Sequence, residues 1–469
     1  MLNSAIAARD VQAFASAAHI ARAIAARQIS PVEVIEATLH RIESLNPELN
    51  AFLAVREEAL AEAQEAERGV GRERLGPLYG VPISLKDLIL TRDRPTTAGS
   101  RIFGAGVTST HDAPVVRRLK RAGAIVVGKN NLHELALGVT NLNAHFGPAR
   151  NPWDRARIPG GSSGGSAVAV AAGMGVASVG SDTRGSIRIP AACCGVTGLK
   201  PTYALVPTEG VIPLAWSLDH VGPITRSAED AALMLGAMVG RAAGRRLAEA
   251  LDRPITKIRF GVAEYFLNDL DPEIARSVLE AIELFRRAGA IVVDVSLPEM
   301  EGTHGSSAVI SLSEAVTYHD QSLRENPQGF GAAVRERLET GYRLSAVDRV
   351  RAERKQAEVV AAFDRVFRDV DVIVGATIPT LPPPIGQDAV RIHDRESTVL
   401  AELPRLTAAA NLAGVPALSV PCGFSTAGLP IGLQLMAARG RDDLVLAAGV
   451  HYQRNTEWHQ RRPPFAELA

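Results

Sequence analysis

The chain has 469 residues, of which 46% are hydrophobic and 22% are charged, an ordinary globular composition that allows a large buried core. Its length favours two lobes or one large α/β domain with insertions. The 51 Lys and Arg residues balance the 51 Asp and Glu residues, which removes any bulk electrostatic argument for binding nucleic acid or an anionic membrane.

The N-terminal segment shows no targeting pattern. Met1 to Ala18 lacks a basic stretch followed by a continuous apolar run, so we expect no signal peptide. The longest apolar stretch, Ala167 to Gly180, spans about 14 residues and is too short to cross a bilayer. We therefore expect a soluble cytoplasmic protein without a membrane partner.

Residues 1–70 are predicted to form a helical region. Ser30-Pro31-Val32-Glu33 is a capping box with proline at the first helical position. An apolar face at helical spacing follows, made of Ile35, Leu39 and Ile42. Residues 56–69 continue as a charged, alanine-rich helix.

From residue 71 to 469, short apolar runs alternate with helical patterns, which indicates an α/β domain with a largely buried sheet. The predicted strands are Val81–Leu85, Ala124–Val127, Ile258–Val262, Ile291–Val295, Val370–Val374 and Leu418–Val420. Helical patterns occupy 112–122, 272–288 and 348–369. Residues 300–345 are polar and helix-like, and we interpret them as a helical insertion.

The cysteine and histidine patterns predict neither disulfides nor a metal site. The cysteines are Cys193, Cys194 and Cys422, and an odd number with two neighbours does not indicate a disulfide framework. His133-Glu134 begins like the zinc motif H-E-x-x-H, but Leu137 stands where the second histidine belongs. We expect no metal and no organic cofactor.

Residues 160–166 read Gly-Gly-Ser-Ser-Gly-Gly-Ser, and four interpretations compete. Composition alone favours a flexible linker, but the run Ala167–Ala172 follows at once and is typical of a buried helix. A phosphate-binding loop needs a Gly-Lys-Ser/Thr end, which is missing. A nucleophile elbow over 161–165 would make Ser163 the nucleophile, but it needs a preceding strand, whereas residues 151–159 are turn-like.

The fourth interpretation joins this segment to two others. Residues 80–87, Gly-Val-Pro-Ile-Ser-Leu-Lys-Asp, place Lys86 at the end of an apolar strand. Residues 180–188, Gly-Ser-Asp-Thr-Arg-Gly-Ser-Ile-Arg, place Ser186 after a short turn. With the glycine-serine loop, these segments resemble the amidase signature family. The resemblance continues, in order, at residues 190–191, 195–202, 217–223, 411–417 and 428–434.

What the resemblance implies is a large, mixed, mostly buried β-sheet flanked by helices on both faces, and a triad. In that triad Ser186 is the nucleophile, Ser162 the bridging serine and Lys86 the base. A serine hydroxyl needs a base within hydrogen-bond reach, and a lysine must lose its proton to act as one, which burial favours by lowering its pKa. The competing interpretation of Lys86 is a surface lysine paired with Asp87; the three ordered motifs outweigh it.

The resemblance also implies an oxyanion hole built from the backbone N–H groups of Thr183, Arg184, Gly185 and Ser186. It implies a cis peptide before Ser162. We interpret Ser163 as a helix N-cap or a support for the loop. We expect Asp182 and Arg188 to brace the nucleophile loop as an ion pair.

Arg184 departs from the family pattern, which has glycine at this position. One interpretation is a solvated surface side chain, and it is slightly favoured. The other places the guanidinium over the pocket mouth, where it selects a substrate carboxylate, a carbamate oxygen or an aromatic ring.

The walls of the substrate pocket are expected from residues near these motifs, although core packing accounts equally well for the apolar ones. Besides Arg184, the substrate-binding candidates are Ala136, Leu137, Gly138, Ile212 and Trp216. Asp219 and His220 are neighbours in the sequence, and we expect them to serve structure rather than a Ser-His-Asp triad.

Three functions are compatible with these patterns. The first is a stand-alone hydrolase that opens a small-molecule amide, carbamate (urethane) or ester through an acyl-enzyme; a homodimer is left open. The second is the glutamine-hydrolysing A subunit of a tRNA-dependent amidotransferase complex. The pattern of that subunit places an arginine before the strand at 370–374, where this sequence has Gln356, with Arg354 nearby. The third, a catalytically silent scaffold, is disfavoured because the triad is complete.

Overall fold

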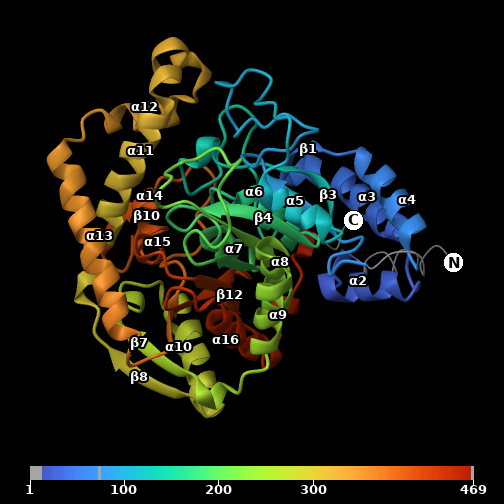
Figure 1. Ribbon diagram of the computed structural model, residues 1–469. Helices are drawn as coiled ribbons and strands as arrows, with labels where there is room; N and C mark the ends of the chain where they lie inside the picture. Colours follow the sequence, from blue (N-terminus) through green and yellow to red (C-terminus); the bar gives the residue numbers. More distant parts are fainter. Residues whose placement is uncertain (1–12, 72–74, 466–469) are drawn as a thin grey trace.

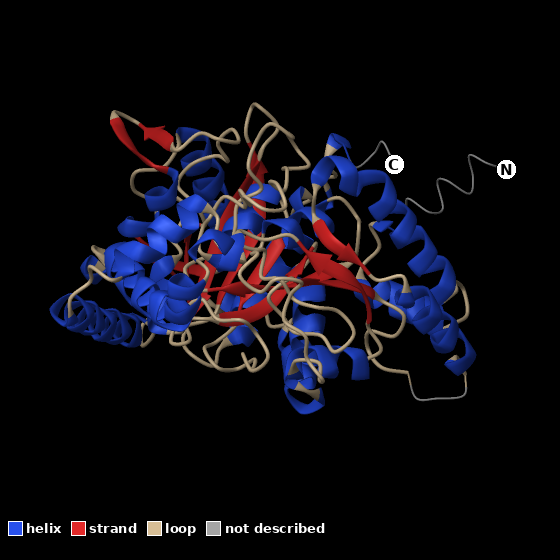
Figure 2. Ribbon diagram, turned by 90° about the horizontal axis from the view of Figure 1, so that it is seen from above, coloured by secondary structure: helices blue, strands red, loops and turns tan. Residues whose placement is uncertain are grey.

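One β-sheet of 11 strands runs through the computed structural model, which describes residues 13–71 and 75–465 (Figures 1 and 2). In chain order its strands are β1 (Phe52–Val55), β2 (Pro82–Lys86), β3 (Ile125–Asn130), β4 (Ala177–Asp182), β5 (Thr197–Lys200), β6 (His220–Thr225), β7 (Arg259–Ala263), β8 (Ile291–Val295), β9 (Val372–Ala376), β12 (Ala417–Phe424) and β13 (Pro430–Ala437). Across the sheet they run β1-β3-β2-β4-β6-β5-β12-β13-β9-β7-β8.

Parallel and antiparallel pairs both occur in this sheet. Parallel pairing joins β2 to β3 and β4, and joins β7 to β8 and β9. The other neighbours pair antiparallel. The sheet is therefore mixed, which confirms the fold expected from the sequence. A separate hairpin is formed by β10 (Ala389–Ile392) and β11 (Arg395–Thr398).

Helices lie around the sheet in both views (Figures 1 and 2). The α-helices are α2 (Ala17–Ala25), α3 (Pro31–Leu49), α4 (Glu58–Gly69), α5 (Pro114–Arg121), α6 (Gly164–Ala171), α7 (Arg188–Cys194), α8 (Ala228–Val239), α9 (Arg241–Ala250), α10 (Pro272–Arg287), α11 (Thr303–Glu325), α12 (Ala332–Gly341), α13 (Ala346–Val366), α14 (Val399–Glu402), α15 (Ala408–Ala413) and α16 (Asp442–Arg454). Short 3₁₀ turns are η1 (Glu134–Ala136), η2 (Ile255–Lys257), η3 (Glu264–Phe266), η4 (Pro298–Met300), η5 (Pro327–Gly329) and η6 (Trp458–Gln460).

Two apolar cores cover the two faces of the sheet. Successive side chains of a strand point to opposite faces, and on β3 Ile125 and Val127 enter one core while Val126 enters the other. The first core contains α6 and α7, which pack against the strands that carry the site, and the second contains α8, α10 and α16. Burial on both faces explains why most strands read as continuous apolar runs.

Local sequence signals account for several of these elements. Ser30 and Glu33 form the expected capping box at the start of α3, and residues 56–69 contain α4. All six predicted strands are present, with boundaries shifted by up to four residues. The strand at 291–295 is the exception in burial, because β8 lies at the edge of the sheet and exposes Ile291 and Val293.

Residues 300–345 are helical, as expected, and contain α11 and α12. With α13 these helices lie together along one side of the molecule (Figure 1). We call residues 303–341 the helical wall. The buried carboxylate of Glu134, in η1, accepts the N–H of Gly331 at the start of α12 (3.0 Å) and so joins the wall to the loop after β3.

Two expectations concern the N-terminal end and the membrane. Residues 1–12, which belong to the predicted helical region and to the segment where a signal peptide was not expected, lie outside the described residues. Within 13–71 and 75–465, no helix is long and apolar enough to cross a membrane.

Candidate active site

The three proposed triad residues lie at or near the ends of strands and helices in the middle of the sheet. Lys86 is the last residue of β2, Ser162 lies in the loop before α6, and Ser186 lies between β4 and α7. Because β2 and β4 are parallel neighbours, paired at Leu85 and Val179, the loops after both strands leave the same edge of the sheet. The fold thus brings the motifs at 80–87 and 180–188 together.

Lys86 is completely buried, with an exposed fraction of 0%. Its Nζ donates to Ser162 Oγ (2.6 Å) and to Ser181 Oγ (2.8 Å). Burial lowers the pKa of Lys86 to about 7, although the carboxylates of Asp219 and Asp182 act in the opposite direction. A large fraction of this amine is therefore neutral near pH 7.

The surface interpretation of Lys86 is wrong. Asp87, its expected partner, pairs instead with the buried Lys129 (2.8 Å). Within the described residues Lys86 therefore has no direct carboxylate partner, which is the condition in which desolvation lowers the pKa of an amine most effectively.

Ser162 and Ser163 connect the glycine-serine loop to its neighbours. The peptide bond between Gly161 and Ser162 is cis, as the resemblance implies. Ser163 caps α6 by position but makes no side-chain cap bond; its hydroxyl donates to the carbonyl of Ser181 (3.1 Å). Ser163 therefore supports the loop. The residues before it are loop, not strand, so the geometry of a nucleophile elbow is missing from this described segment.

The backbone carries the contact between Ser162-Ser163 and the nucleophile loop. The N–H of Ser163 donates to the carbonyl of Ser186 (3.2 Å). Ser186 is 5% exposed, and its hydroxyl makes no hydrogen bond to the described residues while remaining accessible. That hydroxyl is thus free to meet a substrate.

An ion pair braces the nucleophile loop, as predicted. Arg188 and Asp182 are both fully buried and form a two-point contact (3.0 and 3.1 Å). Asn411 and Gln434 add side-chain bonds to Arg188 (2.6 and 2.7 Å). Burial alone would raise the pKa of Asp182, but the Arg188 charge and these bonds outweigh it and hold the pKa below its usual range.

Of the four N–H groups expected to form an oxyanion hole, one is already engaged within the loop. The N–H of Gly185 donates to Asp182 Oδ1 (2.7 Å), so it is engaged inside the loop. The N–H groups of Thr183, Arg184 and Ser186 make no hydrogen bond to the described residues. Three of the four donors are therefore left for a carbonyl oxygen.

Glycine is required at 185 for two reasons. Its φ of +128° is a conformation that residues with a Cβ rarely adopt. A Cβ there would lie 2.2 Å from Thr407 Oγ1 and 2.8 Å from Ile189 Cδ1. The turn before Ser186 is consequently held between α7 and the segment that leads into α15.

Arg184 does not lie on the surface, so the slightly favoured interpretation is wrong. The residue is 8% exposed and its side chain reaches α11. Nε donates to Ser307 Oγ (3.1 Å), and Nη2 contacts the His304 ring (2.9 Å) and donates to the His304 carbonyl (3.2 Å). Burial, with a contribution from the Arg337 charge, lowers the pKa of Arg184.

The other wall candidates divide into buried and exposed residues. Ala136, Leu137 and Ile212 are buried. Gly138 packs on the His133 ring, where a Cβ would lie 2.2 Å from ring atoms. Trp216 is 50% exposed and lines a surface hollow of about 440 Å³ against α11 and α12, together with residues such as Tyr342 and Arg349.

The Asp219 carboxylate joins the start of the nucleophile loop to the segment at 214–215. Its carboxylate accepts the Thr183 hydroxyl (2.6 Å) and the N–H groups of Leu214 and Ala215 (2.9 and 3.0 Å). Burial raises the pKa of Asp219 to about 6. These contacts agree with the structural role expected for Asp219, and they orient Thr183 at the entrance to the nucleophile loop.

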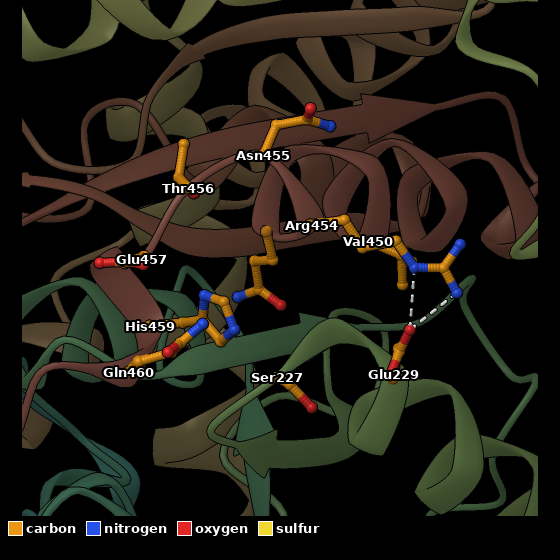
Figure 3. Close-up of a pocket in the computed structure, with 10 residues that line it drawn as sticks. Ser227, Glu229, Val450, Arg454, Asn455, Thr456, Glu457, His459 and Gln460 are labelled. Carbon is orange, nitrogen blue, oxygen red and sulfur yellow. Dashed lines mark hydrogen bonds and ion pairs between the residues drawn. The ribbon is translucent and has the colours of Figure 1, made fainter.

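A separate hollow of about 480 Å³ lies between the start of α8 and the end of α16 (Figure 3). Glu229 and Arg454 form an ion pair at its side (2.8 Å), and none of the triad residues lines it. Among the described residues, no group of three or more His, Cys, Asp and Glu side chains is placed to hold a metal.

Comparison with known proteins identifies the family. The family model for amidases matches residues 33–446, so the chain belongs to the amidase family. The A subunit of the glutamyl-tRNA(Gln) amidotransferase of Chloroflexus aurantiacus is 41% identical, with 94% of this chain and 96% of the relative aligned.

Two solved structures show the same architecture. One, a vestigial protein complex that reveals the evolutionary origins of an s-triazine catabolic enzyme, has a TM-score of 0.90 and 34% identity, with 94% of this chain and 98% of that chain covered. The other, a 6-aminohexanoate cyclic dimer hydrolase complexed with substrate, has a TM-score of 0.87 and 27% identity, with coverages of 97% and 99%.

Gln356, which the sequence analysis placed where the amidotransferase subunit is expected to have an arginine, lies in α13. Gln356 donates to the carbonyl of Leu412 (3.0 Å), next to α15. The nearby Arg354 is exposed. The cationic side chains near the site come instead from the nucleophile loop and the helical wall, and sequence reasoning found only Arg184 among them.

Proposed function

We propose that this protein is a stand-alone amide hydrolase that forms an acyl-enzyme on Ser186, with Ser162 as the bridging serine and Lys86 as the base. The observation that carries the proposal is the buried amine of Lys86, which has no carboxylate partner among the described residues and donates to Ser162 Oγ at 2.6 Å. Its pKa, lowered by burial to about 7, suits a group that must accept a proton near neutral pH.

The first half of the reaction transfers the acyl group. The Ser186 Oγ attacks the amide carbonyl while its proton passes to Ser162 Oγ, and the proton of Ser162 passes to Lys86 Nζ. The C–N bond then breaks, and the leaving amine takes a proton from the lysine through Ser162. An ester between the acyl group and Ser186 remains, and a neutral amine or ammonia is released.

The second half uses water in place of the serine. Water attacks the ester and gives its proton to the same Ser162–Lys86 relay. The bond to Ser186 Oγ breaks, the proton returns to this oxygen, and the carboxylic acid leaves. In both halves, the N–H groups of Thr183, Arg184 and Ser186 are the available donors for the negative charge on the carbonyl oxygen. A carbamate or an ester can follow the same path because it also offers a carbonyl and a leaving group.

A second candidate is the glutamine-hydrolysing A subunit of an amidotransferase complex, which the 41% identity to such a protein favours. Against it stands Gln356, a neutral residue engaged with a backbone carbonyl where that subunit is expected to hold glutamine through an arginine. We therefore rank the stand-alone hydrolase first.

The deciding experiment assays the purified chain alone on aryl amides, short aliphatic amides, carbamates and glutamine. A stand-alone hydrolase turns over at least one non-glutamine amide or carbamate without a partner protein. Activity confined to glutamine, and dependent on added partner subunits, would instead establish the second candidate.

A further inference from the structure

The side chain of Arg184 contacts only neutral groups. Its bonds run to the Ser307 hydroxyl and to the ring and carbonyl of His304, both on α11. The pKa of His304 is lowered to about 3 by burial and by the neighbouring Arg184 and Arg337 charges, so its ring is neutral. No carboxylate lies within ion-pair distance of Arg184 in the described residues.

One nitrogen of the Arg184 guanidinium, Nη1, keeps two N–H groups available for a ligand. Nη1 makes no hydrogen bond to the described residues, yet it is not sealed from solvent. The residue directly precedes Gly185-Ser186 in the chain. A planar guanidinium with one free edge, two residues from the proposed nucleophile, can form charge-assisted hydrogen bonds with a group next to the reacting carbonyl.

Arg337, on α12, is a second cation that has no carboxylate partner in the part of the chain that the structure describes. Its Nη1 donates to the carbonyl of Leu137 (3.4 Å), and its other guanidinium nitrogens make no hydrogen bond to the described residues. Its charge lowers the pKa of Arg184 and also that of His133, whose N–H donates to the carbonyl of Ser162 (3.1 Å). Through Leu137, Arg337 is attached to the same loop after β3 whose His133 N–H contacts the glycine-serine loop.

The carboxylate that acts electrostatically on this cluster is already engaged. The charge of Glu402 partly opposes the lowering of the His304 pKa. This carboxylate already pairs with Arg395 (2.5 Å) and Arg405 (3.1 Å). Two guanidinium groups therefore share a partly desolvated region with neutral histidines. Such an arrangement costs free energy unless an anion completes it.

From this geometry we infer that Arg184 and Arg337 bind an anionic group of the substrate, so that the preferred substrates are amides of dicarboxylic acids whose second carboxylate is free. The inference rests on the proposed function. The plain alternative is that Arg184 only attaches α11 to the nucleophile loop.

The same cluster predicts discrimination against glutamine. Glutaramate is glutamine without its α-ammonium group, and pentanamide has a methyl group where glutaramate has its carboxylate. Among the described residues the cluster offers cations for a carboxylate, whereas Glu402, the carboxylate that acts on it, is already paired and is not free for an ammonium group. We therefore expect the order of kcat/KM to be glutaramate or a shorter homologue first, with pentanamide and glutamine behind it.

The test compares kcat/KM for malonamate, succinamate, glutaramate, pentanamide and glutamine in the wild type, Arg184→Met and Arg337→Met. Arg343→Met is the matched control, because Arg343 is exposed just beyond α12. We expect either site variant to reduce the ratio of the best acid amide to pentanamide by about ten- to hundredfold. Arg184→Lys, which keeps the charge, should recover part of the ratio, and the control should leave it unchanged.

A second measurement reads binding without turnover. Glutarate should protect Ser186 of the wild type from a fluorophosphonate probe, and Arg337→Met should weaken this protection. Arg337 is partly exposed, so its replacement tests the inference even if Arg184→Met does not fold.

The outcomes separate the two proposals. Normal labelling with an unchanged substrate ratio in both variants would overturn the inference and leave the hydrolase standing. A parallel loss on acidic and neutral amides in Arg184→Met, with Arg337→Met like the wild type, would establish the attachment role instead. Absence of both labelling and turnover in the wild type would overturn the proposed function itself.

Discussion

The nucleophile loop and the helical wall meet at Arg184, but they are stabilised in different ways. In the loop, buried charge is neutralised internally: Asp182 and Arg188 pair at 3.0 Å with further bonds from Asn411 and Gln434. Where the loop meets the wall, by contrast, Arg184 of the loop and Arg337 of the wall have no acidic partner in the described residues. A closed network fixes geometry, whereas cations left unpaired are available to a ligand. Under the two proposals above, the loop carries the chemistry, and the place where the loop meets the wall selects the substrate.

The largest effect should come from the nucleophile. Ser186→Ala should abolish fluorophosphonate labelling and reduce turnover by about four to six orders of magnitude, since no other group in the triad can form the acyl ester. Peptide mapping of the labelled wild type should find Ser186. Ser163→Ala serves as the control and should retain labelling, whereas a label on Ser163 would restore the elbow interpretation.

Removal of the base should have the next largest effect. Lys86→Ala should lower kcat/KM by about 10²–10⁴. The base acts when deprotonated, so the wild-type kcat/KM should rise with pH up to the lysine pKa of about 7 and then level off. The Lys86→Ala variant should not show this rise of kcat/KM with pH. A variant with near-normal activity and an unchanged pH profile would remove Lys86 from the mechanism.

A smaller effect should follow from displacing the loop without changing its chemistry. Gly185→Ala places a Cβ 2.2 Å from Thr407 Oγ1, and a displacement of about 1 Å near the reacting groups can cost about a hundredfold in rate. Gly428 is a matched control: its φ is +76° and nothing lies within 4 Å of an added Cβ. Gly428→Ala should therefore cost about 1 kcal/mol of stability with kcat/KM unchanged. Equal kinetics for both variants would show that the turn tolerates movement.

The smallest effect should come from loosening the wall. Glu134 accepts the Gly331 N–H (3.0 Å) and the Ser100 hydroxyl (2.5 Å). Glu134→Ala should increase amide hydrogen exchange at the start of α12 by about five- to thirtyfold, the equivalent of about 1–2 kcal/mol. Labelling of Ser186 should persist. Glu134→Gln keeps one acceptor oxygen, so its exchange rate should lie between those of the wild type and Glu134→Ala. Unchanged exchange in both variants would show that the wall is held by other contacts.

The sequence predicts the strands that are apolar and misses those that are not. Residues 372–376 and 417–424 are recognisable because both faces of the sheet are covered. Within β4 and β6, by contrast, Gly180, Ser181, Asp182 and Pro223 interrupt the apolar pattern. These strands lie beside the site, where backbone approach and polar contacts replace side-chain packing. Strand β8, predicted from its mostly apolar sequence, is an exposed edge strand, because a run of apolar residues does not reveal which neighbours it will have.

Within the site, short-range relations are predictable and long-range ones are not. The pairing of Asp182 with Arg188 is local and follows from the sequence. The contact between Arg184 and His304 joins residues 120 positions apart, on a helix with no recognisable motif. Residue type alone therefore favours a surface position for Arg184, although the fold buries it. The partial engagement of the oxyanion hole likewise depends on one bond, from Gly185 to Asp182, that no residue pattern encodes.

The buried Lys86 amine also makes folding release a proton. An unfolded lysine keeps its proton up to about pH 10.5, whereas Lys86 gives it up at about pH 7 because burial disfavours the charge. Between these two values the unfolded chain binds more protons than the folded one, so this residue makes the folded state more stable as the pH rises and less stable as it falls. Below pH 7 both states are protonated and the folded chain carries the full desolvation penalty. The burial that lowers the pKa of Lys86, and that suits it to the proposed role of base, therefore reduces the stability of the folded state at neutral and acidic pH.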